Sequence, residues 1–221
     1  MHDMKIIKEK ESLFRIDFFN DLIDFSLMRS IKHMLNNGIC SQFKNSLFIK
    51  ANNIWFYRDF IKEQNSKNGT FRLSHEWCLR LLYSLSEQIK YLIQEESKCF
   101  YQFDFENLLV MDDLFFYVSN EHLREIEDEH IQIYSILEKE NGFFSPELFQ
   151  TNSMPPISIH YKTIYYSLAL LIISAGLYKK IECLNKNMFE KLCKPLKESK
   201  LYYFLIRCLH EDVNKRVLLY L

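Results

Sequence analysis

The stretch NGFFSPELF, residues 141–149, contains a carboxylate that could do chemistry, because Glu147 follows Ser145 and Pro146 beside two phenylalanines. A carboxyl group in apolar surroundings can have a raised pKa and act as a general acid. The same glutamate could instead cap a helix or be a structural anchor. The segment alone leaves these three alternatives open, so the rest of the chain must decide between them.

Two other groups of residues could carry chemistry, and neither has the spacing that its chemistry requires. His122 stands near an acidic run, which contains Glu125, Glu127, Asp128, Glu129 and His130. No spacing in this run puts three ligands on one helix face, so we interpret it as a solvated segment. Ser145 and His160 could suggest a hydrolase, but FFSPE lacks the G-x-S-x-G elbow of such enzymes. The sequence therefore predicts no metal site and no serine hydrolase.

The composition is that of a globular protein with a net charge of −1 and no extended basic stripe. This balance disfavours nucleic-acid binding through phosphate neutralisation. The lysine-rich stretch 179–200 is interrupted by glutamates, which is typical of a solvated helix face. We expect nucleic acid as a partner only if this stretch binds it.

The cysteines and the apolar runs bear on the compartment. The six cysteines form no CxxC pair, and Cys78, Cys99 and Cys208 lie in apolar runs. This pattern favours buried free thiols in a reducing, cytoplasmic environment. The N-terminus lacks the apolar core of a signal peptide, and the run 163–178 is short for a membrane span. We therefore expect a buried helix there and no membrane association.

The N-terminal part of the chain, residues 1–66, is expected to form a small unit. Apolar residues at three- and four-residue steps predict a helix over 13–36. Two β-rich runs, 46–50 and 53–61, predict a hairpin, and the polar residues 64–70 predict a linker.

The remaining residues, 67–221, are expected to form a helical body. Ser74 has the position of a cap for a long helix that ends near Glu95. Asp112 and Asp113 separate two short apolar runs in 106–120 and predict a second hairpin. Residues 161–175 predict a buried helix, and 200–221 a helix, a break at 212–214 and another helix. The predicted fold class is α+β, mostly α.

Several of these segments resemble, in the same order, the motifs of the protein kinase family. LSHEWCLRLLYSLSEQIKYLIQEE (73–96) is similar to the long helix before the catalytic loop. FYQFDFENLLV (100–110) resembles the loop HRDxxxxNxLV, which places Asn107 on the loop asparagine. FFSPEL resembles the APE motif that closes the activation segment. The resemblance implies a kinase-like fold with a reduced N-terminal lobe, built from the helix 13–36 and the strands at about 46–61.

The resemblance continues to the end of the chain. YKTIYYSLALLI (161–172) is similar to the buried helix KSDVWSLGVLL, with Ile164 in place of the aspartate. LYYFLIRCLHEDVNKR (201–216) resembles LxxLIxxCLxxDPxxR. Arg216 then falls on the arginine that pairs with the APE glutamate. The resemblance therefore implies a buried ion pair between Glu147 and Arg216 and no catalytic role for Glu147.

The residues that carry phosphoryl transfer in the family are replaced in this sequence. Gln102 stands where the catalytic aspartate is expected, and Asn120 stands where the aspartate of DFG is expected. Neither amide can replace a carboxylate as a base or as an equally good Mg²⁺ ligand. Asp104 could serve as the base only if the loop were rebuilt.

The phosphate-binding parts of the family are also absent from the sequence. The first glycine is Gly38, so no Gly-rich loop precedes the first helix. Lys5 and Lys8 are the only nearby candidates for the phosphate-binding lysine.

These replacements predict a pseudokinase, which is not an enzyme and has no catalytic, nucleotide-binding or metal residues and no cofactor. We expect it to act as a scaffold or regulator that binds a protein partner. Two alternatives stay open. One is a small helical factor that docks on a large assembly such as a ribosome, and the other is a divergent kinase with residual activity.

Overall fold

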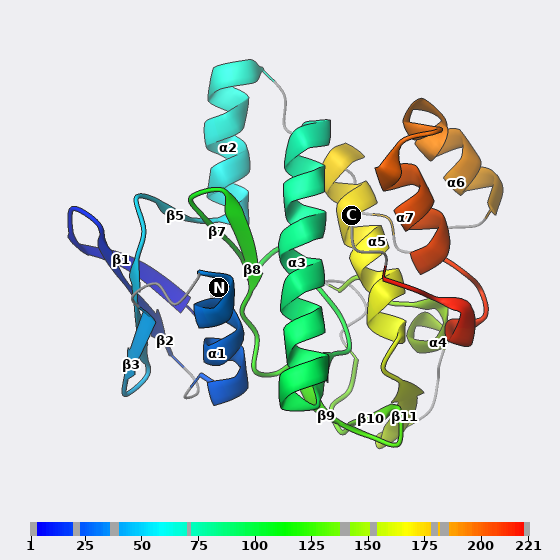
Figure 1. The fold of residues 1–221 in the computed structure, drawn as a ribbon, viewed down its shortest axis with the longest axis horizontal. Coiled ribbons are helices and arrows are strands. Elements are labelled where there is room, and N and C mark those ends of the chain that lie inside the picture. Colours follow the sequence, from blue (N-terminus) through cyan, green and yellow to red (C-terminus); the bar gives the residue numbers. More distant parts are fainter. Residues whose placement is uncertain are drawn as a thin grey trace.

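The computed structural model of the protein combines three small antiparallel sheets with α-helices (Figure 1). It describes residues 4–19, 23–35, 40–69, 72–137, 142–150, 154–177, 181 and 186–218. The content is 44% helix and 27% strand, which agrees with the expected α+β class but contains more strand than a mostly helical fold.

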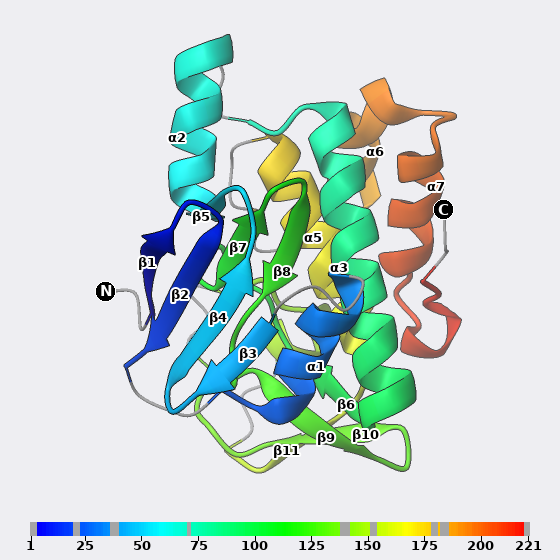
Figure 2. The ribbon, with the colours of Figure 1, turned by 60° about the vertical axis from the view of Figure 1, so that its left-hand side comes forward.

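The first sheet is formed by four strands of the N-terminal region in the order β1-β2-β4-β3 (Figure 2). The strands are β1 (Met4–Lys10), β2 (Leu13–Phe18), β3 (Cys40–Phe43) and β4 (Ser46–Lys50). Helix α1 (Phe25–Met34) lies between β2 and β3 in sequence and contacts both β3 and the long helix of the body.

The predicted helix over 13–36 is therefore wrong in its first part, and among the described residues of this range only Phe25–Met34 are helical. Phe14 and Ile16 are buried, whereas Arg15 between them is partly exposed, which is the two-residue period of a strand. The apolar residues at 14 and 18 fit both periods. What decides between them is the pairing of Leu13–Phe18 with β1 and β4, which a local pattern cannot reveal.

The predicted hairpin of 46–50 with 53–61 is also wrong. Residues 46–50 are a strand, but they pair with β2 and β3. The following strand β5 (Ile54–Phe56) pairs instead with β7 (Leu108–Met111), more than fifty residues away. From Tyr57 the chain forms α2 (Tyr57–Asn68), so the predicted linker 64–70 is mostly helix.

Gly69, with φ of 67°, ends α2 in the left-handed region where glycine is favoured. The predicted division of the chain at residues 66 and 67 falls inside this helix. The division into two domains stays a prediction.

Helix α3 (His75–Glu96) confirms the predicted long helix and occupies the centre of the molecule (Figure 1). Ser74 caps it, because its side-chain oxygen accepts a hydrogen bond from the Trp77 backbone nitrogen at 3.3 Å. Leu81, Leu85 and Leu92 on its buried face are fully or almost fully inaccessible to solvent. The helix contacts α1, the strand β8 (Leu114–Tyr117) and the helix α5 (Thr163–Leu177), so it connects α1 of the N-terminal region to the body.

The predicted hairpin in 106–120 is confirmed. Strands β7 and β8 (Leu114–Tyr117) pair in antiparallel register through a turn at Asp112 and Asp113. The Asp112 carboxylate accepts hydrogen bonds from the backbone nitrogens of Asn52 and Asn53, at 3.0 and 2.8 Å. This turn therefore fastens the connection between β4 and β5 to the body.

Strands β5, β7 and β8 form a three-stranded sheet. The remaining sheet has the order β11-β10-β9-β6 and includes most of the acidic segment. Its strands are β6 (Lys98–Phe100), β9 (Leu123–Glu127), β10 (His130–Ile133) and β11 (Ile157–His160). The acidic run thus lies at the end of the β9–β10 hairpin, with Asp128 and Glu129 in its turn.

The C-terminal part of the body is helical. Its elements are α4 (Pro146–Phe149), α5 (Thr163–Leu177), α6 (Lys186–Cys193), a 3₁₀ turn (Lys194–Leu196), α7 (Lys200–Cys208) and a second 3₁₀ turn (Val213–Lys215). Helix α5 is buried from Thr163 to Ala175, as the sequence predicts. The second helix predicted after 212–214 is wrong over the described residues, because only the short turn at 213–215 follows and 216–218 are not helical.

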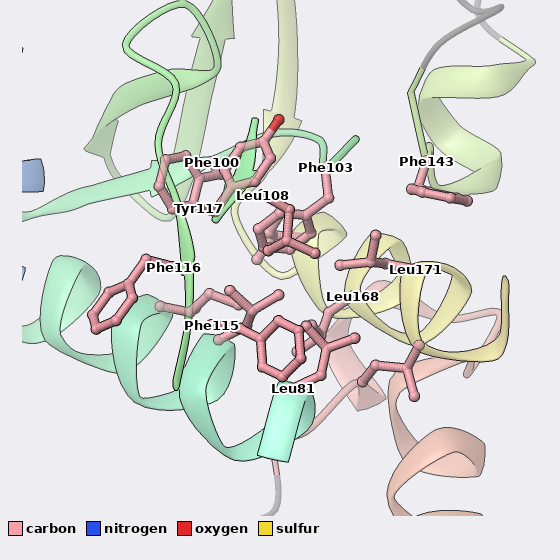
Figure 3. Close-up of a cluster of buried hydrophobic side chains, with 14 of the residues drawn as sticks. Leu81, Phe100, Phe103, Leu108, Phe115, Phe116, Tyr117, Phe143, Leu168 and Leu171 are labelled. Carbon is pink, nitrogen blue, oxygen red and sulfur yellow. The ribbon is translucent and has the colours of Figure 1, made fainter. Parts of the chain in front are cut away.

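The core is dense in aromatic side chains where α3, α5 and the β7–β8 hairpin meet (Figure 3). Cys78, Cys99 and Cys208 are buried free thiols, as predicted, and Cys193 is a fourth. Among the helices that the structure describes, none combines the length and apolarity needed to cross a bilayer.

Candidate functional site

Most of the residues singled out by the sequence gather around the loop between β6 and β7. This loop, 101–107, carries Gln102 and Asn107, and it lies against the segment 118–122 that follows β8. The Tyr101 backbone nitrogen donates to the His122 carbonyl at 3.1 Å, and the Val118 nitrogen donates to the Asn107 carbonyl at 2.9 Å. These backbone bonds bring the two segments into register and place their side chains against one another.

Four buried side chains form a continuous hydrogen-bonded chain in this place. The Gln102 amide nitrogen lies 2.6 Å from Nε2 of His122, and Nδ1 of His122 lies 2.5 Å from the Tyr117 hydroxyl. The Tyr117 hydroxyl donates to Oδ2 of Asp104 at 2.8 Å. All four residues are at most 7% exposed. We refer to Gln102, His122, Tyr117 and Asp104 as the buried polar chain.

One arrangement of protons satisfies every step of this chain. The Gln102 NH₂ group donates to Nε2 of His122, so Nδ1 must carry the imidazole proton and donate to the Tyr117 oxygen. The tyrosine hydroxyl proton is then directed to the Asp104 carboxylate. Burial lowers the pKa of His122 to about 4. The imidazole is therefore neutral at neutral pH, as this arrangement requires.

Asp104 is committed to structural bonds. Besides the Tyr117 hydroxyl, its carboxylate accepts hydrogen bonds from the Asn107 backbone nitrogen at 2.7 Å and from the Asn107 side chain at 2.9 Å. Burial and this carboxylate together raise the pKa of Tyr117 well above its usual value. Asp104 is only 5% exposed. The alternative in which Asp104 serves as a general base would require at least one of these bonds to break.

The segment NGFFSPELF packs directly on this loop. The Phe143 nitrogen donates to the Phe103 carbonyl at 2.7 Å, and the two residues form an isolated β-bridge. A Cβ atom at Gly142 would lie 2.9 Å from the Gln102 side-chain oxygen and closer still to the Phe144 ring. Gly142 thus lets this segment approach the loop, while Asn141 lies outside the described residues.

Aromatic rings of the core hold Tyr117, a member of the buried polar chain, in place. Figure 3 shows Tyr117 among Phe100 and Phe103, with its hydroxyl oxygen on the side of the cluster away from Leu81. The Tyr117 ring packs edge-on against Phe100 and Phe103, with centroids 5.0 and 4.8 Å away. Aromatic packing therefore fixes the tyrosine ring, and the ring fixes where its hydroxyl points.

Asn120 ties the segment after β8 to the first turn of α1. Its side-chain oxygen accepts a hydrogen bond from the Asp24 backbone nitrogen at 2.9 Å. The Asp24 carboxylate in turn caps α1 by accepting a hydrogen bond from the Ser26 backbone nitrogen. It also accepts one from the Lys98 ammonium group at 2.7 Å. Burial raises the pKa of Asp24, but the bonds from Lys98 and Ser26 outweigh this effect, so the pKa is lowered and the carboxylate stays charged. Asn120 thus has a structural bond between the N-terminal unit and the body.

Glu147 and Arg216, which the sequence analysis paired, meet in the structure. Nη1 of Arg216 donates to Oε2 of Glu147 at 3.2 Å, and Nη2 donates to Oε1. The Arg216 side chain is fully buried, and its Nε donates to the His210 carbonyl at 2.8 Å. The guanidinium also lies 5.1 Å from the centre of the Tyr166 ring. Burial raises the pKa of Glu147, but the Arg216 bond outweighs it and the net shift is downward.

Ile164, the remaining position singled out, lies fully buried in the first turn of α5.

The structure does not bring together the residues of the metal and hydrolase candidates. The acidic residues near Asp128 lie along the β9–β10 hairpin, and Glu129 and His160 are 3.8 Å apart. Within the described ranges, no three histidine, cysteine, aspartate or glutamate side chains gather closely enough to hold a metal ion. Ser145 is buried at the start of α4 and no described contact joins it to His160.

Sequence reasoning missed Tyr117, Gln88 and the role of His122. The Gln88 side chain, fully buried on α3, bonds both backbone groups of Tyr117 and the Ser30 hydroxyl. A glutamine on the apolar face of a helix is a signal that could have been noticed, because such a group requires partners when buried.

No protein-family model matches the chain, and no curated protein is significantly similar to it.

Proposed function

We propose that this protein has a protein kinase-like fold, has lost phosphoryl transfer and acts as a platform that binds a protein partner. The order of its elements supports the fold: a small sheet with one helix, then, after β5 and α2, the long helix α3, a loop, the β7–β8 hairpin, the segment that ends at Glu147, and the buried helix α5. The bidentate contact of Glu147 with Arg216, 69 residues apart, supports it independently.

The N-terminal unit supports the loss of the reaction. In kinases a strand lysine pairs with a glutamate of the following helix and holds the phosphates. Here the helix after β2 is α1, which contains no acidic residue. Strand β2 carries Arg15, and this side chain pairs with Glu9 and Asp17 at 2.5 and 2.9 Å. The lysine-to-glutamate pair therefore has no counterpart in these elements.

The β1–β2 hairpin that precedes α1 also supports the loss of phosphoryl transfer. Strands β1 and β2 are joined at Glu11 and Ser12, so no glycine lets the backbone approach a phosphate group there. Lys5 and Lys8 lie in β1, the edge strand of the sheet.

The observation that carries the proposal is the buried polar chain. At the position of the catalytic base Gln102 has a neutral amide, and its NH₂ group is bonded to His122. The nearest carboxylate, Asp104, is fully engaged by Asn107 and Tyr117. The Gln102 side-chain oxygen is buried without a partner among the described residues, but opening the remaining bonds would leave further buried polar groups unpaired at a cost. This place in the fold is thus built to stay closed.

Exposed apolar side chains support the role as a platform. Tyr134 and Ile136 follow β10 and are 69% and 85% exposed, and Met154 before β11 is 88% exposed. Tyr134 and Ile136 belong to the segment that ends at Glu147, which would be the activation segment in a kinase, and Met154 follows that segment. Large exposed apolar side chains close together in sequence, as those of Tyr134 and Ile136 are, favour contact with another protein. The proposal requires no cofactor.

Two experiments test the two halves of the proposal. First, the purified protein is incubated with radiolabelled ATP, Mg²⁺ or Mn²⁺ and a generic acceptor protein, with an active kinase as positive control. We expect no transfer above the no-protein blank. Transfer that follows the protein concentration and disappears in Asp104→Asn would overturn the loss of activity.

Second, the protein and its Ile136→Asp variant are used to capture partners from an extract of the source cells. Tyr203→Asp is the matched control, because Tyr203 is 54% exposed on α7, away from this segment. We expect one protein to be lost with Ile136→Asp and retained with Tyr203→Asp. Capture that is identical for all three, or that is abolished by ribonuclease, would contradict this half.

A further inference from the structure

An apolar cavity lies away from the buried polar chain, between the first turn of α3 and the last turn of α5. Helices α6 and α7 and the 3₁₀ turn between them line its other sides, the cavity is partly open to solvent, and Figure 1 shows both helices beside these ends of α3 and α5. Its volume is about 260 Å³. An aliphatic cavity of about 150 Å³ can already stay dry and hold benzene, so this one can take a larger apolar group.

The inner walls of the cavity are aliphatic. Ile172, Leu201 and Leu205 are at most 2% exposed and line it together with the thiols of Cys78 and Cys193. Burial raises the pKa of these thiols to about 12 and about 11, so both are uncharged at neutral pH. Among the described residues that line the cavity, none is aromatic or acidic. Such a surface fits an alkyl chain and offers a flat aromatic ring no stacking partner.

The rim of the cavity carries the positive charge of Arg72. Arg72 and His75 line it and are exposed to solvent. The N-terminus of the 22-residue helix α3 lies at the same rim and adds its partial positive charge. An anion at the end of an alkyl chain would be held at this rim, and an ammonium group would be repelled.

We propose that this cavity binds the alkyl chain of a free fatty acid, with the carboxylate at Arg72. The inference does not depend on the proposed function, because the cavity shares no residue with the buried polar chain or with the exposed segment near Ile136. The ligand would stabilise the packing of α6 and α7 on α3 and α5.

The test uses decanoate, with decanol and decylamine as chain-matched probes, titrated calorimetrically into the full chain. We expect saturable binding of one decanoate per chain and weaker binding of decylamine. Arg72→Gln should weaken decanoate binding by about fivefold, as for loss of an exposed ion pair, and leave decanol unchanged. Arg207→Gln is the matched control, because Arg207 is exposed on α7 and does not line the cavity.

A second measurement needs no variant and reports the position of the ligand. Decanoate should slow the reaction of Cys193 with a small thiol reagent, read by mass spectrometry, with the buried thiol of Cys99 as internal reference. Absence of saturable binding, equal binding of decanoate and decylamine, or labelling of Cys193 at an unchanged rate would each overturn the proposal.

Discussion

Replacing Glu147 by alanine should strongly destabilise the protein, because Arg216 would keep its charge in a fully buried position without its counter-ion. Removal of one partner of a buried ion pair costs on the order of 3–5 kcal/mol. The Glu147 side chain is 33% exposed, so water can partly replace the carboxylate. Arg216 also keeps its bond to the His210 carbonyl. We therefore expect a loss of about 2–3 kcal/mol in the free energy of unfolding.

A loss of this size is measurable, because the free energy of unfolding of a typical domain is only about 5–15 kcal/mol. For a chain of this length it corresponds to a fall in Tm of roughly 5–10 °C. The assay is thermal and urea unfolding followed by circular dichroism. Glu106→Ala is the matched control, because Glu106 pairs with Arg58 where both side chains are exposed, and such pairs contribute less than about 1 kcal/mol.

A double-mutant cycle distinguishes the ion pair from loss of packing alone. Arg216→Met removes the buried charge, so the double variant should be less destabilised than the sum of the two single variants. An unfolding curve of Glu147→Ala that coincides with the parent curve would refute the reasoning. Strict additivity in the cycle would refute the pairing.

Three further results are expected from the buried polar chain and its neighbours. Tyr117→Phe removes the hydroxyl between Asp104 and His122 and should lower the free energy of unfolding by about 1–3 kcal/mol, measured in urea. Because burial depresses the pKa of His122 from 6.5 to about 4, the stability it contributes is complete above pH 6.5. It should be lost as the pH falls toward 4, a fall that urea unfolding at several pH values would detect and that should be smaller in His122→Gln. Asn120→Ala should cost about 1 kcal/mol and speed amide exchange at Asp24, and unchanged exchange there would contradict the bond between them.

The parts of the fold that the sequence predicted well are those specified by local pattern. Ser74 and the spacing of Leu81, Leu85 and Leu92 define α3 without help from the rest of the chain. Asp112 and Asp113 mark the turn of the β7–β8 hairpin for the same reason. Each of these signals lies within one element, so a single sequence is sufficient to read it.

The failures arise where distant pairing decides the structure. Residues 13–18 become a strand because β1 and β4 flank them, although the apolar spacing also fits a helix. Strand β5 pairs with β7 and not with its neighbour in sequence, which no local pattern encodes.

The candidate site also has one part that the sequence predicted and one part that it did not. The partnership of Glu147 with Arg216 followed from a resemblance in motif order, and the structure brings the two side chains together. The buried polar chain could not be predicted, because it depends on which way the side chains of Gln102, Tyr117 and His122 point once three segments have packed.

The central proposal is that the loop 101–107, which resembles a kinase catalytic loop, is closed by its own hydrogen bonds and binds no nucleotide. The most direct measurement is a calorimetric titration of ATP into the protein, with and without Mg²⁺. The account predicts no saturable heat up to millimolar ATP in either condition. Saturable binding of one ATP per chain that requires Mg²⁺ would contradict it.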